Sequence, residues 1–135
     1  MHQATAHLLQ RYYDAFNAGD MDTFLSLLTD DVIHDINQSG REVGKAAFAK
    51  FMERMNRNYR ETIVDLSITT NEAGDRAAVE FTVIGEYLAT DEGLPEAKGQ
   101  TYRLPAGAFF VIRDGQVARV TNYYNLEDWI AQVSV

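Results

Sequence analysis

Residues 109–124 read FFVIRDGQVARVTNYY, so two runs of alternating residues flank the pair Asp114-Gly115. An Asp-Gly pair between such runs is typical of a β-hairpin turn. Arg119 is the only charge in the second run, so we expect it to point outward together with Val117, Thr121 and Tyr123. The inward residues of that strand are then Ala118, Val120, Asn122 and Tyr124.

The first strand of this hairpin should match that orientation. Arg103 and Arg113 are expected to face outward, which leaves Ala106, Ala108, Phe110 and Ile112 inward. A two-residue turn would put Phe110 on the face of Arg119, so we predict a three-residue loop with Gly115 in the left-handed position of a bulge. The outer face is then too apolar for water, which predicts a homodimer through it; its residues are Phe109, Val111, Val117, Thr121 and Tyr123.

Outward from the hairpin, the sequence predicts an α+β fold in one domain, residues 1–135. Helical spacing is seen over 5–18, after Asp20 and over 45–58, and a short helix follows Asn125. Alternation predicts strands at 32–36, near 64–68, from 79 to about 89, and at 100–113 and 117–124. Strands of such length curl. We therefore expect a curved antiparallel sheet forming a cone-shaped half-barrel around a cavity, closed by about three N-terminal helices and a short C-terminal helix.

The composition of the chain excludes several classes of function. The chain has 135 residues, no cysteine, and a net charge of −8. It therefore has no disulfides or thiolate nucleophiles, and its acidity argues against a nucleic-acid partner. The three histidines lack metal-ligand spacing and there is no glycine-rich phosphate loop, so we expect no metal and no cofactor. No apolar run is long enough for a bilayer and no signal pattern opens the chain, which predicts a soluble cytoplasmic protein without a membrane partner.

Two segments resemble a known group of proteins. Residues 12–20 (YYDAFNAGD) and 28–32 (LTDDV) resemble the opening of ketosteroid isomerases and SnoaL-like polyketide cyclases. Residues 109–129 resemble the closing hairpin and tail of the same nuclear-transport-factor-2-like superfamily. The resemblance implies the cone-shaped α+β fold over nearly the whole chain. It implies less about the reaction, because this scaffold carries isomerases, cyclases, dehydratases, epoxide hydrolases and binding domains.

The resemblance transfers only part of the known sites. The oxyanion-hole tyrosine of the isomerases falls on Tyr12, whereas their base aspartate falls on Ile36. Their second oxyanion-hole group, an aspartate, falls near Ala108 and is missing. The closing-strand aspartate of limonene-type epoxide hydrolases falls on Asn122. These departures argue against orthodox steroid isomerisation and against epoxide hydrolysis.

His34 and Asp35 are the candidate proton-transfer residues. Alternation places His34 on the cavity side, where a neutral imidazole can take a proton near neutral pH; the alternative is a core histidine bonded to backbone. Asp35 faces away if alternation holds, but it reaches the base position or orients His34 if the strand kinks at Asn37.

Tyr12 and Asn122 are the candidate stabilisers of negative charge on a substrate oxygen. The choice between Tyr12 and Tyr13 stays open, and so does plain core packing for the tyrosine and a structural hydrogen bond for Asn122. The predicted substrate contacts are Tyr124, Phe110, Val120, Ala108 and Phe81.

These residues predict a cofactor-independent enzyme of the isomerase, cyclase or dehydratase type. It would transfer protons on a small hydrophobic carbonyl or hydroxyl compound held in the internal cavity. One alternative is a non-catalytic ligand-binding or dimerisation domain of the same fold. A further alternative, a limonene-type epoxide hydrolase, is disfavoured by Asn122.

Overall fold

The computed structural model describes residues 2–36, 38 and 40–134. Its helices are α1 (His2–Ala18), α2 (Met21–Ser26), α3 (Lys45–Asn58) and α4 (Leu126–Val133). Its strands are β1 (Leu28–Ile36), β2 (Gly40–Val43), β3 (Tyr59–Thr70), β4 (Arg76–Tyr87), β5 (Thr101–Arg113) and β6 (Gln116–Tyr124). The predicted helices and long strands are confirmed. Asn37, where a kink was considered, lies outside the described residues.

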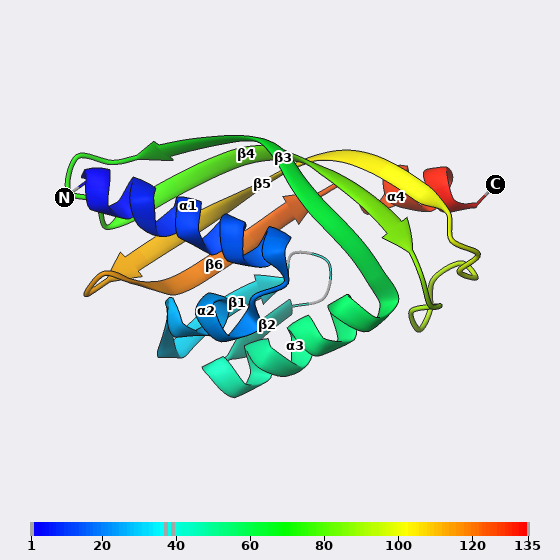
Figure 1. The fold of residues 1–135 in the computed structure, drawn as a ribbon, viewed down its shortest axis with the longest axis horizontal. Helices are drawn as coiled ribbons and strands as arrows, with labels where there is room; N and C mark the ends of the chain where they lie inside the picture. Colours follow the sequence, from blue (N-terminus) through cyan, green and yellow to red (C-terminus); the bar gives the residue numbers. More distant parts are fainter. Residues whose placement is uncertain (1, 37, 39, 135) are drawn as a thin grey trace.

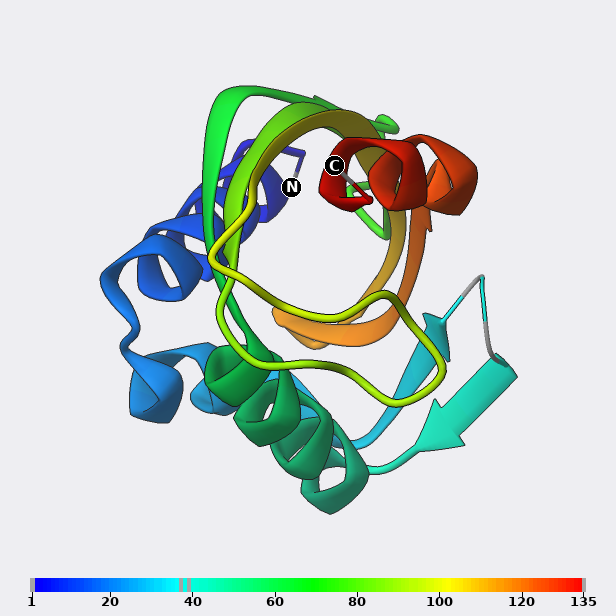
Figure 2. The ribbon, with the colours of Figure 1, turned by 90° about the vertical axis from the view of Figure 1, so that its right-hand side faces the viewer.

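The strands form one six-stranded sheet in the order β2-β1-β6-β5-β4-β3. Neighbours are antiparallel, as predicted, except that β1 runs parallel to β6. The sheet curls through an arc, and α1, α2 and α3 lie along its open side (Figures 1 and 2). The architecture is therefore the predicted curved α+β half-barrel with one parallel pairing.

The half-barrel has two ends, which differ in the connections they hold. The hairpin end holds the β3–β4 turn (residues 71–75) and the β5–β6 turn (114–115). The loop end holds the β4–β5 connection, residues 88–100, and α4. In Figure 2 this connection crosses in front of the curled sheet, between α3 and α4. Among the described residues, no helix is long and apolar enough to cross a bilayer.

The β5–β6 turn differs from the prediction. Arg113 pairs with Gln116, so the loop has two residues, and Asp114 and Gly115 both have positive φ (52° and 73°). That is a type I′ turn, whose twist fits the flanking strands.

The bulge predicted at this turn lies instead within β6. Val111 pairs with Arg119 but Ile112 pairs with Val117, which leaves Ala118 as the extra residue. Phe110 and Val120 therefore pair and are both buried inside, as predicted. Val117, predicted to face outward, is fully buried because a bulge puts two successive residues against the core.

A second bulge interrupts β3. Val64 pairs with Thr82 and Ser67 with Glu80, so Asp65 and Leu66 together oppose one residue of β4. Asp65 has φ of 55°, in the left-handed region that non-glycine residues seldom adopt. The extra residue reverses the phase of alternation, so the inward positions before the bulge are the odd numbers 59, 61 and 63, and after it 66 and 68.

Candidate functional site

His34 lies in the interior wall of β1. Only 2% of its surface is exposed, and its ring stacks on Phe48 with centroids 4.2 Å apart and meets Phe51 edge-on at 4.6 Å. Burial lowers the pKa of His34 to about 4, so the imidazole is neutral at pH 7. A neutral imidazole keeps one nitrogen free to accept a proton.

Two polar groups bracket the His34 ring. The Asn122 amide nitrogen lies 3.4 Å from Nε2, and the Glu42 carboxylate lies 3.8 Å from Nδ1. Because an amide N–H can only donate, Nε2 is the acceptor and Nδ1 carries the proton, directed toward Glu42. Neither Nδ1 nor that carboxylate oxygen has another partner among the described residues. The arrangement presents the basic nitrogen on the Asn122 side of the ring.

Asp35 points to the opposite face of β1. Arg41 Nε donates to its carboxylate at 2.6 Å, and the Thr121 hydroxyl donates at 3.0 Å. The hydrogen bond from Arg41 holds the pKa of Asp35 below its usual value. Strict alternation therefore continues through His34 and Asp35. Asp35 is a surface ion-pair residue of the outer face and does not reach the interior.

The region around Tyr12 is filled by rings, which we call the aromatic core: Tyr12, Tyr13, Phe24, Phe48, Phe81 and Phe110. Tyr12 lies 4.5 Å from Phe24 and 5.4 Å from Phe110, between ring centroids, and Tyr13 lies 5.4 Å from Phe81. Burial raises the pKa of both tyrosines, so both hydroxyls are neutral. Tyr12 is linked to His34 through Phe24 and Phe48, not by direct ring contact.

Most of the predicted substrate contacts belong to this packed interior. Four of the five are buried against other side chains: Phe81, Ala108, Phe110 and Val120. Tyr124 differs, since 38% of it is exposed at the loop end of β6. Among the predicted residues, the structure therefore brings together His34 and Asn122, places Tyr124 two residues beyond Asn122 on the same strand face, and separates them from Asp35 and Tyr12.

The inner face of β3 carries a carboxylate, Glu61, that the sequence pattern did not predict there. Glu61 accepts a hydrogen bond from the Tyr102 hydroxyl at 2.6 Å, and burial raises the pKa of Glu61 above its ordinary value. The bulge at Asp65 explains the omission. Continuing the alternation of Leu66 and Ile68 backward without a bulge would place Glu61 outside.

A second carboxylate at the loop end was also missed. Asp91, from the connection 88–100, accepts hydrogen bonds from the Tyr59 hydroxyl at 2.8 Å and the Asn58 amide at 3.3 Å. The Tyr87 hydroxyl accepts from the Asp91 backbone N–H and donates to the Pro95 carbonyl. These four hydrogen bonds hold the connection across the loop end. Its composition resembles any solvated loop, so no sequence signal marks Asp91 as buried.

These groups form what we call the loop-end cluster: Tyr59, Glu61, Asp91, Tyr102 and Tyr124. Burial, followed by the charges of Glu61 and Asp91, raises the pKa of Tyr124. Trp129 of α4 packs edge-on against Tyr59 and Tyr102 at 6.0 and 5.9 Å. Phenols beside carboxylates under an indole suit a ligand with an apolar body and oxygen substituents.

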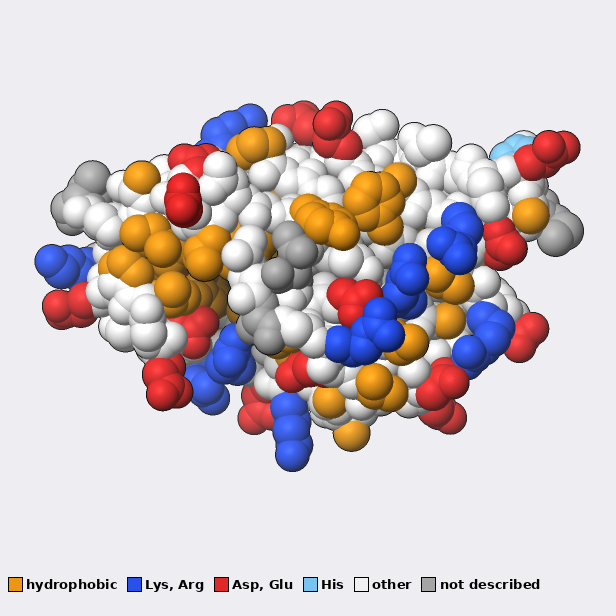
Figure 3. All heavy atoms as spheres, turned by 180° about the vertical axis from the view of Figure 1, so that it is seen from behind, with side chains coloured by type: hydrophobic (Ala, Val, Ile, Leu, Met, Phe, Trp, Pro, Cys, Tyr) orange, Lys and Arg blue, Asp and Glu red, His pale blue; other side chains and the backbone are white. Residues whose placement is uncertain are grey.

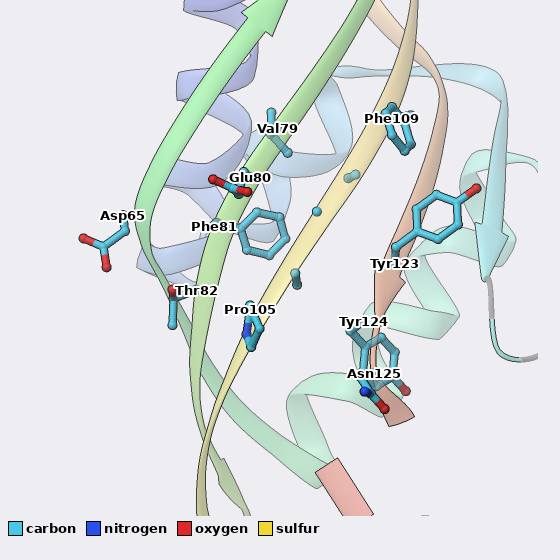
Figure 4. Close-up of a pocket in the computed structure, with 13 residues that line it drawn as sticks. Asp65, Val79, Glu80, Phe81, Thr82, Pro105, Phe109, Tyr123, Tyr124 and Asn125 are labelled. Atoms are coloured by element: carbon cyan, nitrogen blue, oxygen red, sulfur yellow. The ribbon is translucent and has the colours of Figure 1, made fainter. Parts of the chain in front are cut away.

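The outer face of the sheet carries a separate groove of about 720 Å³. Figure 4 shows Glu80, Thr82, Phe109 and Tyr123 around it. Phe109 and Tyr123 are 51% and 43% exposed and meet edge-on at 5.5 Å. Seen from behind, apolar side chains lie in patches between charged ones (Figure 3). In the described ranges, no three His, Asp or Glu side chains are grouped to hold a metal ion.

The chain is similar to known proteins in both sequence and fold. The SnoaL-like domain model matches residues 9–120. A crystal structure from Pseudomonas putida, described as a putative polyketide cyclase, is 64% identical, with a TM-score of 0.94 over 96% of this chain and 97% of that one. A second with the same description, from Xanthomonas campestris, is 57% identical, with a TM-score of 0.95 over 98% of each chain.

A more distant match concerns the fold alone. An NTF2-like protein from Burkholderia xenovorans is 15% identical, with a TM-score of 0.79 over 98% of each chain. No curated protein matches the chain.

Proposed function

Because the chain belongs to the SnoaL-like family, we propose that it is a cofactor-independent enzyme that transfers protons on a hydrophobic carbonyl compound, with polyketide-type cyclisation or isomerisation as the overall reaction. The family membership confirms the resemblance of residues 12–20, 28–32 and 109–129. Two relatives above 50% identity are described as putative polyketide cyclases, which supports the cyclase type.

The observation that carries the proposal is the His34–Asn122 pair. Aldol cyclisation, isomerisation and dehydration share one step, the removal of a proton from carbon next to a carbonyl. A substrate bound between the two residues replaces their mutual hydrogen bond, so that the neutral His34 Nε2 accepts that proton and the Asn122 amide donates to the carbonyl oxygen as it gains negative charge. Glu42, opposite Nδ1, stabilises the resulting imidazolium.

The shared step can be measured without knowing the natural substrate. 2-Tetralone is a hydrophobic ketone whose α-protons exchange with deuterium when a base removes them, and ¹H NMR in D₂O follows that exchange. We expect the protein to accelerate exchange and His34→Gln to lower the accelerated rate by about 10²-fold or more. Glutamine keeps a hydrogen-bonding side chain but cannot take a proton.

Asp35→Asn is the matched control, since Asp35 is the next residue of β1 on the opposite face. It should leave the exchange rate unchanged. Full exchange in a folded His34→Gln protein would contradict the proposal. Binding of 2-naphthol, an analogue of the enol, without any exchange of 2-tetralone would favour the non-catalytic ligand-binding alternative.

We also propose that two copies pair through the outer sheet face. The support is the exposed ring pair Phe109 and Tyr123 beside the groove on the outer face of the sheet, which a second copy can cover with the same patch. Sedimentation should give a dimer for the natural chain and a monomer for Phe109→Glu/Tyr123→Glu. Val43→Glu, at an exposed apolar residue of β2, is the control, and a monomeric natural chain would contradict the pairing.

A further inference from the structure

Glu61 has one committed and one available oxygen. Its Oε2 accepts the Tyr102 hydroxyl, whereas no described residue hydrogen-bonds Oε1. Oε1 is also not among the fully enclosed polar atoms without a partner. The carboxyl is thus oriented by Tyr102 through Oε2, whereas Oε1 has no hydrogen-bond partner among the described residues, on the interior face of β3.

The Glu61–Tyr102 pair spans three strands and requires glycine at position 85 of the middle strand. Glu61, Gly85 and Tyr102 are register partners in β3, β4 and β5. The Tyr102 ring lies over Gly85, where an added Cβ would come within 2.2 Å of the ring. Only glycine leaves room for the phenol to reach Glu61.

Glu61 and His34 both lie on inward-facing positions of the curled sheet. His34 contacts Phe51 of α3, and the chain runs from the end of α3 into β3, which carries Glu61. On the opposite wall, Asn122 contacts His34, and Tyr124 follows on the same face of β6 toward the loop end. A ligand that contacts both groups would lie along the inner face of β6, between the imidazole and the loop end.

The two groups also have opposite protonation tendencies. Burial lowers the pKa of His34, which favours the form that accepts a proton, and raises the pKa of Glu61, which favours the form that donates one. Titratable groups whose environments separate their pKa values in this way are suited to acid and base roles in one reaction.

We propose that Glu61 is the proton donor of this site, with Tyr102 as its positioning residue. This rests on the proposed function. The protonated carboxyl gives its proton to the carbonyl oxygen while His34 Nε2 takes a proton from the α-carbon, so the ketone becomes an enol, Glu61 a carboxylate and His34 an imidazolium. Return of the imidazolium proton to carbon and of the enol O–H proton to Glu61 restores both residues.

The test uses Glu61→Gln in the full chain, since glutamine retains an acceptor for Tyr102. We expect the 2-tetralone exchange rate to fall by about 10²-fold and 2-naphthol binding to weaken. Glu86→Gln, a carboxylate on the outer face of β4 paired with Arg60, is the matched control and should behave as the natural chain.

Tyr102→Phe separates positioning from packing. The hydrogen bond from Tyr102 lowers the pKa of Glu61, so its removal should raise that pKa further and move the alkaline loss of exchange to higher pH. A merely structural tyrosine would lower the rate without moving the profile. ¹³C NMR of labelled glutamate should show Glu61 titrating above ordinary glutamates.

The outcomes separate this inference from the proposed function. Full exchange in Glu61→Gln together with loss in His34→Gln would overturn the donor role and keep the His34 mechanism. Loss in Glu61→Gln with full exchange in His34→Gln would keep Glu61 and overturn His34. An ordinary titration of Glu61, or no exchange and no 2-naphthol binding by the natural chain, would overturn the donor role.

Discussion

The aromatic core and the loop-end cluster are built from the same strand faces but contain different chemistry. In β5, Tyr102 and Phe110 are eight residues apart on one face; Phe110 meets other rings, whereas Tyr102 meets the Glu61 carboxyl. Burying a ring gains free energy in proportion to apolar area, whereas burying a carboxyl costs free energy unless it is bonded. The aromatic core therefore contributes more to the stability of the fold than the loop-end cluster does, because the loop-end cluster contains buried carboxyl groups.

The largest expected effect is the loss of a ring from the core. Phe110 is 1% exposed, so Phe110→Ala leaves a cavity among rings and should lower the free energy of unfolding by about 3–5 kcal/mol. Urea unfolding measures it. Phe109→Ala, the neighbouring residue on the outer face, should cost far less. Equal losses would mean that the two faces are not distinguished as described.

His34 stacks on Phe48 of the aromatic core, and its burial predicts a pH-dependent stability. The folded pKa of about 4 is below the ordinary 6.5, so between these values the unfolded chain binds a proton that the folded chain does not. Stability is therefore full above pH 6.5 and falls as the pH drops toward 4, by about 3 kcal/mol at most. Urea unfolding across this range should show the loss.

The control for this prediction is His34→Gln, which cannot titrate. The difference in unfolding free energy between the natural chain and this variant should change with pH between 6.5 and 4 and level off on either side. A constant difference would show that the ring is solvated in the folded protein.

A further prediction concerns the stability contributed by Asp91 at the loop end. Asp91→Ala leaves the Tyr59 hydroxyl and the Asn58 amide without their acceptor, which should cost about 1–3 kcal/mol. Amide exchange over residues 88–100 should accelerate, because the connection loses its buried anchor. Glu92→Ala, at the exposed next residue, should change neither quantity.

The sequence predicts the elements and the inward face of most strands, but it does not predict the bulges or which side chains pack together. Helical spacing and alternation identify the helices, the long strands and the inward position of His34, because each follows from local periodicity. Alternation failed at Val117, next to the extra residue Ala118, and at Asp65, because one extra residue reverses the face and no residue type there marks a bulge. Periodicity also gives the direction of Tyr12 but not its neighbours, so packing against Phe24 could not be predicted.

The smallest expected effect belongs to Tyr12, the residue that the family resemblance favours most. Its hydroxyl makes no hydrogen bond to a described side chain and is not among the fully enclosed polar atoms that lack a partner, so its removal leaves no buried group unpaired. Tyr12→Phe should therefore change the unfolding free energy by no more than about 1 kcal/mol. It should also leave 2-tetralone exchange unchanged, in contrast to Glu61→Gln. An exchange rate reduced by about 10²–10³-fold would be the loss of an oxyanion donor, and the substrate would then extend into the aromatic core.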